Sequence, residues 1–214
     1  MRCDKNMKRE LIILIFCILL FSCKKEEGCT DPIALNYNID ATIEDESCIY
    51  PSIKNFNIGF GASVNGMPLE LGQTGIFPFT NHSNDIYNIQ TLRYIISDIT
   101  IHADDDTKLL LDEVHFVDLS IDSTLTLTIP EIILNKQYTS ISFTMGLDST
   151  KNITNLFLNE NFFPSFAWPD ILGGGYHYMQ LEGDFNTVFN GYATHTGPTN
   201  GIDFSFSKTF SIYI

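Results

Sequence analysis

The residues best suited to chemistry lie in one window, residues 163–197 of the 214-residue chain. This window contains the only tryptophan, Trp168, and two of the five histidines, His177 and His195. It also contains Met179, close to His177 in the sequence. Imidazole nitrogens bind copper, and a thioether is a soft donor that favours Cu(I). The residues therefore predict a copper site, and the alternative left open is that His177 and Met179 are ordinary core residues.

The spacing of these residues favours a shared site if residues 176–182 form a strand. Side chains alternate between the two faces of a strand, so His177 and Met179 project from the same face with Cα atoms roughly 6.5–7 Å apart. His195 lies on a later segment that can pair beside this strand and supply a second imidazole. The prediction is that His177, His195 and Met179 share one copper ion.

Several short motifs also occur in a fixed order along the chain. The motifs before the window are Leu92-Arg93-Tyr94 with Ser97-Asp98-Ile99, and Phe143-x-x-Gly146-Leu147-Asp148-Ser149 followed by Asn152. The motifs within it are Trp168, Gly175-Tyr176, Leu181-Glu182-Gly183 and His195-x-Gly197. In these residues the segment 56–214 resembles the MbnP-like domain family. That family is named for a periplasmic protein encoded beside methanobactin biosynthesis genes, and it is related to copper-repressible surface proteins of methane oxidisers.

The resemblance implies copper binding through histidines and through an oxidised tryptophan, kynurenine. It also implies a partner, a di-haem cytochrome c peroxidase-like enzyme that performs this oxidation. Carried over to this chain, it makes His195 a ligand and Trp168 the oxidised residue, whereas His177 and Met179 are assigned from their side-chain chemistry. The chain departs from the family pattern after Trp168, where residues 169–174 lengthen the path to Tyr176.

Composition and missing motifs exclude several other functions. The net charge of −14 repels phosphate backbones, so nucleic acid is not an expected partner. The sequence contains neither a Gly-x-Ser-x-Gly nucleophile elbow nor a His-Glu-x-x-His motif. We therefore do not expect an enzyme.

The first 22 residues have the pattern of a secretory signal. Lys8-Arg9 precede the apolar run 11–21, which at ~11 residues is too short to cross a bilayer of ~30 Å as a helix. The run ends at Leu20-Phe21-Ser22-Cys23, which resembles a bacterial lipobox and predicts acylation of Cys23. The charged residues 24–27 resemble a tether that sends some lipoproteins to the outer face of the outer membrane. The expected location is the cell envelope, with an outer-membrane anchor and a periplasmic or surface-exposed chain.

Residues 23–51 form a short extension after the signal. Once Cys3 and Cys17 leave with the signal and Cys23 is acylated, Cys29 and Cys48 are the remaining thiols. In an oxidising compartment they predict a Cys29–Cys48 disulfide. An alternative use of this extension is loose calcium binding through its carboxylates. The candidate ligands are Asp31, Asp40 and Asp45. It is not favoured over a stapled spacer, and the loop lacks the glycine and glutamate positions of an EF-hand.

From Ser52 onward, apolar residues recur with a period of two. The expected strands cover 56–60, 92–101, 108–111, 124–129, 138–143, 176–182 and 202–214. Many short strands separated by Gly, Asn, Asp and Pro predict an all-β fold, an antiparallel β-sandwich with an immunoglobulin-like two-sheet architecture in residues 52–214. A short helical turn is expected between Thr150 and Asn159.

Two functions remain open on this sequence. The first is a cell-envelope lipoprotein whose MbnP-like domain binds copper. The second is a surface adhesion or ligand-binding module without a metal, in which exposed aromatic residues contact a glycan or a protein. Those aromatic residues would be Phe162, Phe163, Phe166, Tyr176 and Tyr178.

Overall fold

The computed structural model describes residues 25–212. The predicted signal peptide and the predicted acylation site Cys23 therefore lie outside the described residues. Contacts divide the chain into two compact units, Met1–Pro51 and Ser52–Ile214. Between residues 25 and 212, no helix is long and apolar enough to cross a membrane.

The first unit contains the predicted disulfide, which is confirmed. Cys29 and Cys48 are bonded with their Cα atoms 4.8 Å apart. An isolated β-bridge joins Glu27 to Ile43, and the Glu44 carboxylate accepts hydrogen bonds from the backbone N–H and hydroxyl of Thr30. A segment this short buries little apolar surface, so covalent closure supplies much of what keeps it compact.

The second unit is organised around β6 (Thr91–Ala103), a long strand with an apolar interior. β7 (Lys108–Asp118) pairs along one edge of β6. Two strands share the other edge: β9 (Tyr138–Met145) pairs with its C-terminal half and β10 (Met179–Phe185) with its first four residues. This sharing extends the sheet beyond the end of β9.

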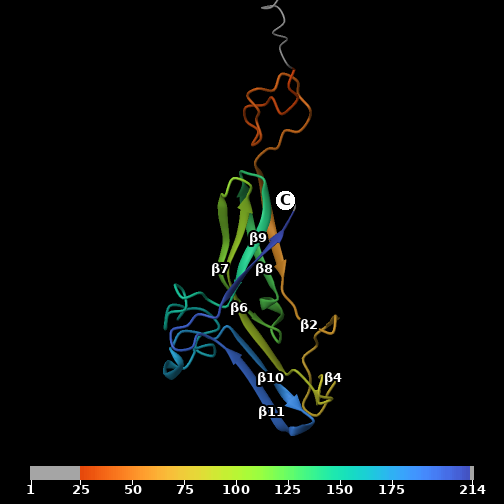
Figure 1. Cartoon of the computed structure of the whole chain (residues 1–214), viewed down its shortest axis with the longest axis vertical. Helices are drawn as coiled ribbons and strands as arrows, with labels where there is room; N and C mark the ends of the chain where they lie inside the picture. Colours follow the sequence, from red (N-terminus) through yellow and green to blue (C-terminus); the bar gives the residue numbers. More distant parts are fainter. Residues whose placement is uncertain (1–24, 213–214) are drawn as a thin grey trace, which may run out of the picture. The chain divides into compact units, whose positions relative to one another are not determined.

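Further strands continue the sheet outward from β9 and β10. β12 (Phe206–Ser211) pairs with β9, and β11 (Thr187–Thr196) pairs with β10, beside which it lies in Figure 1. The short strands β5 (Ile86–Tyr87) and β4 (Phe79–Thr80) follow β10. All of these pairings are antiparallel, and β11 pairs with β10 alone among the described strands.

A second, two-stranded sheet packs on the first. It consists of β1 (Ser52–Gly59) and β8 (Thr126–Leu134). Leu134 of β8 lies in a core cluster with Ile101 of β6 and Tyr138 of β9, and Phe56 of β1 packs against this cluster. The smaller elements are the pair β2 (Ser63–Val64) and β3 (Met67–Pro68) and the 3-10 turns η1 (Asp122–Thr124) and η2 (Asp170–Leu172).

The predicted all-β, antiparallel, two-sheet architecture is confirmed, but the expected helical turn at residues 150–159 is replaced by separate hydrogen-bonded turns. The Asp148 carboxylate accepts the backbone N–H groups of Thr150 and Lys151, which competes with helical hydrogen bonding. Asn155 has a φ of 67°, a left-handed conformation that a right-handed helix does not contain. The 3-10 turns of the second unit lie elsewhere, in η1 and η2.

Candidate metal centre

A local backbone pairing places Trp168 beside His177. The Trp168 N–H donates to the Gly175 carbonyl at 2.9 Å, and the His177 N–H donates to the Phe166 carbonyl at 2.8 Å. Between these two bonds, Ala167 and Tyr176 form an antiparallel bridge. The intervening residues 169–174 form a loop that contains η2. The insertion therefore lengthens this loop without separating Trp168 from His177.

Asn152 fixes the strand-like segment that carries His177. Its side-chain oxygen accepts the Tyr176 N–H at 2.6 Å, and its side-chain nitrogen donates to the Tyr176 carbonyl at 3.2 Å. Gly175 has a φ of 86°, and a Cβ atom there would collide with the Asn152 side chain. The Asn152 and Gly175-Tyr176 motifs therefore have a shared role, which is to hold the backbone directly before His177.

The register of β10 and β11 supplies the second histidine. Gln180 pairs with His195 and Glu182 with Ala193. Paired residues share a face and alternate residues return to it, so Glu182 and His195 lie on the same face of the sheet. A hydrogen bond of 2.7 Å between His195 Nε2 and Glu182 Oε1 joins the two side chains.

Three rings from distant segments meet at this point. The ring centroids of His177 and His195 are 5.1 Å apart at an interplanar angle of 80°. The indole of Trp168 lies edge-on to His177, with centroids 4.7 Å apart. The structure thus brings together His177, His195 and Trp168, three of the four side chains that the sequence assigned to the site.

Hydrogen bonding leaves one ring nitrogen free on each imidazole. His177 Nδ1 lies 3.1 Å from the Phe166 carbonyl, which can only accept, so Nδ1 carries the proton and Nε2 keeps its lone pair. In the neutral ring of His195, Nε2 donates to the carboxylate of Glu182 and Nδ1 keeps the lone pair. Histidines that bind metals commonly donate their second N–H to a carbonyl or a carboxylate in this way.

Burial also favours the neutral form of His177. Desolvation is the main cause that lowers its pKa, and the neighbouring His195 lowers it further. The Phe166 carbonyl and the Glu182 carboxylate act in the opposite direction without reversing the shift. A histidine with a lowered pKa keeps its lone pair at neutral pH, which metal coordination requires.

Trp168 is 9% exposed, and its indole is packed tightly against the backbone of Gly197. A Cβ atom at residue 197 would lie 2.7 Å from the indole, so only glycine permits this approach. The Trp168 Nε1 is buried and has no hydrogen-bond partner among residues 25–212. A buried polar atom without a partner costs free energy and marks a place where a further group would be accommodated.

Met179 does not join this group, contrary to the sequence-based expectation. It pairs with Thr196, one position from the Gln180–His195 pair, and the alternation of β10 directs its side chain to the face opposite His195. The expectation assumed a regular strand from residue 176, whereas β10 begins at Met179. His177 precedes the strand, so its direction is set by the pairing with Phe166 and not by the alternation of β10.

The aromatic residues proposed as an exposed contact surface are largely core. Phe162, Phe166, Tyr176 and Tyr178 are buried in one cluster with Ile95 of β6, and Phe163 is partly buried against it. Tyr176 donates no hydrogen to solvent there, because its hydroxyl accepts the N–H of Phe157 at 2.8 Å within this core. The cluster therefore supports the base of the candidate centre and does not form an exposed surface for a glycan.

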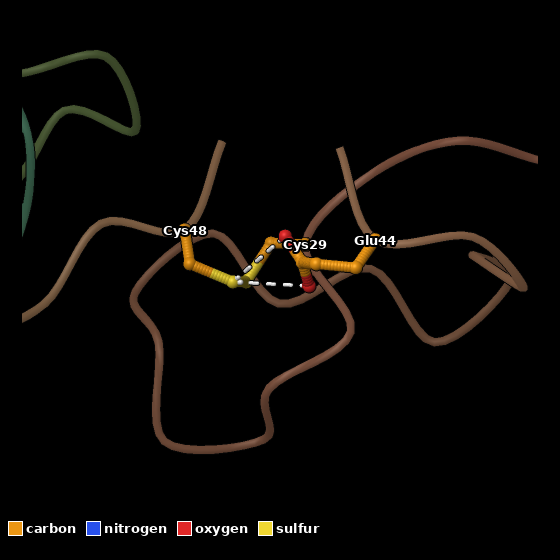
Figure 2. Close-up of side chains that lie close together, drawn as sticks. All are labelled: Cys29, Glu44 and Cys48. Carbon is orange, nitrogen blue, oxygen red and sulfur yellow. Dashed lines mark hydrogen bonds between the residues drawn. A yellow bond between two sulfur atoms is a disulfide. The ribbon is translucent and has the colours of Figure 1, made fainter. Parts of the chain in front are cut away.

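The N-terminal unit contains one group of three potential donor atoms within 4.8 Å of one another, the only such group in residues 25–212. It consists of Cys29, Glu44 and Cys48, drawn in Figure 2. Both sulfurs are consumed in the disulfide and have neither a proton nor a thiolate charge, so this group is not a metal site. The structure does not gather Asp31, Asp40 and Asp45 into such a group.

The same spacing separates direct ligands from supporting residues at the histidine pair. His177, His195 and Glu182 do not form a group of three donor atoms within 4.8 Å. Glu182 therefore acts on His195 as a hydrogen-bond acceptor, and the two imidazoles are the ligands that the chain itself offers. Sequence analysis missed the roles of Glu182 and Asn152, because both depend on pairing register.

Comparison with known proteins places the chain in a family. The model of the MbnP family matches residues 53–214. Among solved structures, MbnP from Methylosinus trichosporium is similar with a TM-score of 0.49 and 9% identity, covering 76% of this chain and 73% of that one. No curated protein matches. Because the family model spans well over half of the sequence, the chain belongs to the MbnP family.

Proposed function

We propose that this protein is a cell-envelope lipoprotein that binds copper at His177 and His195, next to Trp168. The observation that supports it most is the pair of imidazole rings, 5.1 Å apart, each with one nitrogen hydrogen-bonded and one free. The His177 Nε2 and the His195 Nδ1 would hold the metal. The role is binding, and we propose no catalytic reaction.

The donor set favours copper over other biological metals. Calcium and magnesium prefer oxygen ligands, which the histidine pair does not supply. Structural zinc sites use four protein ligands and catalytic ones use three, whereas this centre offers two imidazoles. Divalent copper binds nitrogen ligands more tightly than zinc does. Because Met179 faces away, the argument from a soft thioether no longer applies and Cu(II) suits the site as well as Cu(I).

Trp168 has a further role in this proposal. The resemblance of its surroundings to the MbnP family implies oxidation to kynurenine by a di-haem cytochrome c peroxidase-like partner. The reaction opens the indole and converts Nε1 into an aromatic amine with a lone pair, which an indole nitrogen does not offer. Nε1 of Trp168 is already buried without a partner beside His177, so the amine would lie next to the histidine pair. Intact mass spectrometry of protein from its native host tests this step through the net exchange of one carbon atom for one oxygen atom.

The proposed location follows from the sequence signal. Acylation of Cys23 would anchor the chain to the outer membrane, facing the periplasm or the cell surface. Metabolic labelling with a fatty acid tests this, and a Cys23→Ala variant should lose the label. Labelling of that variant to the same extent would contradict the anchor.

The copper site is tested by titration of the purified protein with Cu(I) and Cu(II) in competition with zinc. We expect about one copper ion per chain, with copper displacing zinc. His177→Ala and His195→Ala should each weaken binding about tenfold or more, whereas His82→Ala is the matched control because His82 is exposed in a loop. Unchanged copper affinity in both site variants would reject the proposal.

The alternative function, adhesion through an exposed aromatic face, loses its structural basis. Four of its five residues are buried in the core, and a glycan could not reach them without local unfolding. No other described feature of this segment favours that function over copper binding.

A further inference from the structure

A cavity of about 450 Å³ lies on the side of the β10–β11 pair away from the histidines. Leu181 of β10 and Tyr192 of β11 line it, and their partners in the register are Thr194 and Gly183. These positions alternate with Glu182 and His195, so they face the opposite side of the sheet. The volume falls in the range of small-molecule sites, roughly 300–1,000 Å³. It is therefore a separate site on the same two strands.

Three aromatic side chains form the walls of this cavity: Tyr87, Phe185 and Tyr192. Phe185 pairs with Tyr87 across the register of β10 and β5, and Tyr87 lies tilted against Phe79 with ring centroids 5.5 Å apart. The Tyr192 hydroxyl donates to the Asn88 carbonyl at 2.6 Å, which fixes its ring. The aromatic faces are thus held in place before any ligand arrives.

The polar part of the lining is negative and has few free donors. The Asp85 carboxylate accepts hydrogen bonds from the side-chain amides of Asn81 and Asn186, and these bonds lower its pKa so that it stays ionised. Asn81 already donates to Asp85, and Tyr192 already donates to Asn88. None of the described residues that line the cavity is Lys, Arg or His. An anionic ligand would find no positive partner here.

We propose that this cavity binds an organic cation with a quaternary ammonium head group. Such a cation is attracted to the faces of aromatic rings and has no N–H groups that need acceptors. Tyr87, Phe185 and Tyr192 would surround the head group, the Asp85 carboxylate would balance its charge, and an apolar substituent would contact Ile89 and Leu181. The net charge of −14 adds a long-range attraction for cations.

The experiment compares choline with its uncharged isostere, in which a carbon atom replaces the nitrogen. Isothermal calorimetry on the copper-free protein should show choline binding with an affinity at least about tenfold higher than that of the isostere. Phe185→Leu and Tyr87→Leu keep apolar contact but remove a ring face, and each should weaken choline binding about threefold to thirtyfold. Phe189→Leu is the matched control, because Phe189 lies on β11, is 92% exposed and does not line the cavity.

Asp85→Asn separates charge from shape. It should weaken choline binding and leave the isostere unchanged, and thermal unfolding of each variant shows whether the fold persists. Equal affinity for the two probes, no binding of choline, or full binding in folded Phe185→Leu and Tyr87→Leu variants would overturn the proposal. Because all measurements omit copper, these outcomes are independent of the histidine centre.

Discussion

At the scale of single residues, the candidate centre depends on which nitrogen of each imidazole is already hydrogen-bonded. The Phe166 carbonyl occupies Nδ1 of His177, and the Glu182 carboxylate occupies Nε2 of His195. The two histidines therefore present different nitrogens, and each is oriented by a partner that does not itself bind the metal. Partners of this kind raise the basicity of the ligand and hold its ring in position.

Glu182→Gln tests the role of this carboxylate. The variant keeps the size of the side chain but removes the charge that orients His195 and increases its basicity, so copper affinity should fall about tenfold to a hundredfold. Thermal stability should change little, because the Glu182 side chain is 41% exposed. Glu160→Gln, an exposed carboxylate elsewhere, is the control. An unchanged copper affinity in Glu182→Gln would show that Glu182 does not orient the ligand.

Gly197→Ala tests the close approach of the indole. The added Cβ would lie 2.7 Å from the Trp168 ring, so the indole must shift or the backbone must yield. Overpacking of this kind costs about 1–3 kcal/mol of unfolding free energy. Because Trp168 is the only tryptophan, its fluorescence spectrum reports the displacement directly. Gly61→Ala is the control, since a Cβ atom at Gly61 meets nothing within 4 Å.

At the scale of elements, the β10–β11 pair matters most because it carries both proposed sites. The centre with Glu182 and His195 lies on one face, and the aromatic cavity with Leu181 and Tyr192 lies on the other. Asn88 secures the end of this pair: its side-chain oxygen accepts the Asp184 N–H at 2.8 Å, and its side-chain nitrogen donates to the carbonyls of Gln73 and Ile76. One buried amide thus joins β10 to the loop before β4.

Asn88→Ala should therefore destabilise the second unit. Asn88 is fully buried, and the variant leaves two carbonyls and one backbone N–H without their partner. The expected loss is about 1–3 kcal/mol of unfolding free energy, measured by urea denaturation. Asn159→Ala, at an exposed position, should change stability by no more than about 0.5 kcal/mol. Equal stability of the two variants would contradict the assigned role of Asn88.

At the scale of the whole molecule, the chain consists of two compact units with different sources of stability. Residues 25–51 are closed by one disulfide, whereas the unit from Ser52 onward has two hydrophobic core clusters. All residues of both proposed binding sites belong to the second unit. Binding should therefore not depend on the disulfide.

Replacement of Cys29 and Cys48 by serine tests this independence. In the chain-entropy model, loss of the bond removes ~3 kcal/mol from the stability of the first unit. Limited proteolysis followed by mass spectrometry should then show cleavage within residues 25–51 and an intact fragment from Ser52 onward. Copper affinity and the thermal midpoint of the second unit should equal those of the unaltered protein. Loss of the second unit in the same transition would show that the two units fold together.

The sequence by itself determined the features that depend on local pattern and on counting. The period-two alternation around Phe56 and along residues 92–101 predicted antiparallel strands, because side chains alternate across a strand wherever it lies. The elimination of the other cysteines predicted the Cys29–Cys48 bond. The ordered motifs from Leu92 to Gly197 indicated the family that the family model then matched over residues 53–214.

Only the tertiary structure decided which side chains share a face and which are buried. A shift of one residue in the pairing of β10 with β11 would exchange the faces of all their side chains, and nothing local fixes that register. It therefore took the structure to place Met179 away from His195 and Glu182 beside it. Likewise, Phe166 and Tyr176 have the same aromatic character in a core as on a surface, and only long-range packing buried them beneath the two histidines.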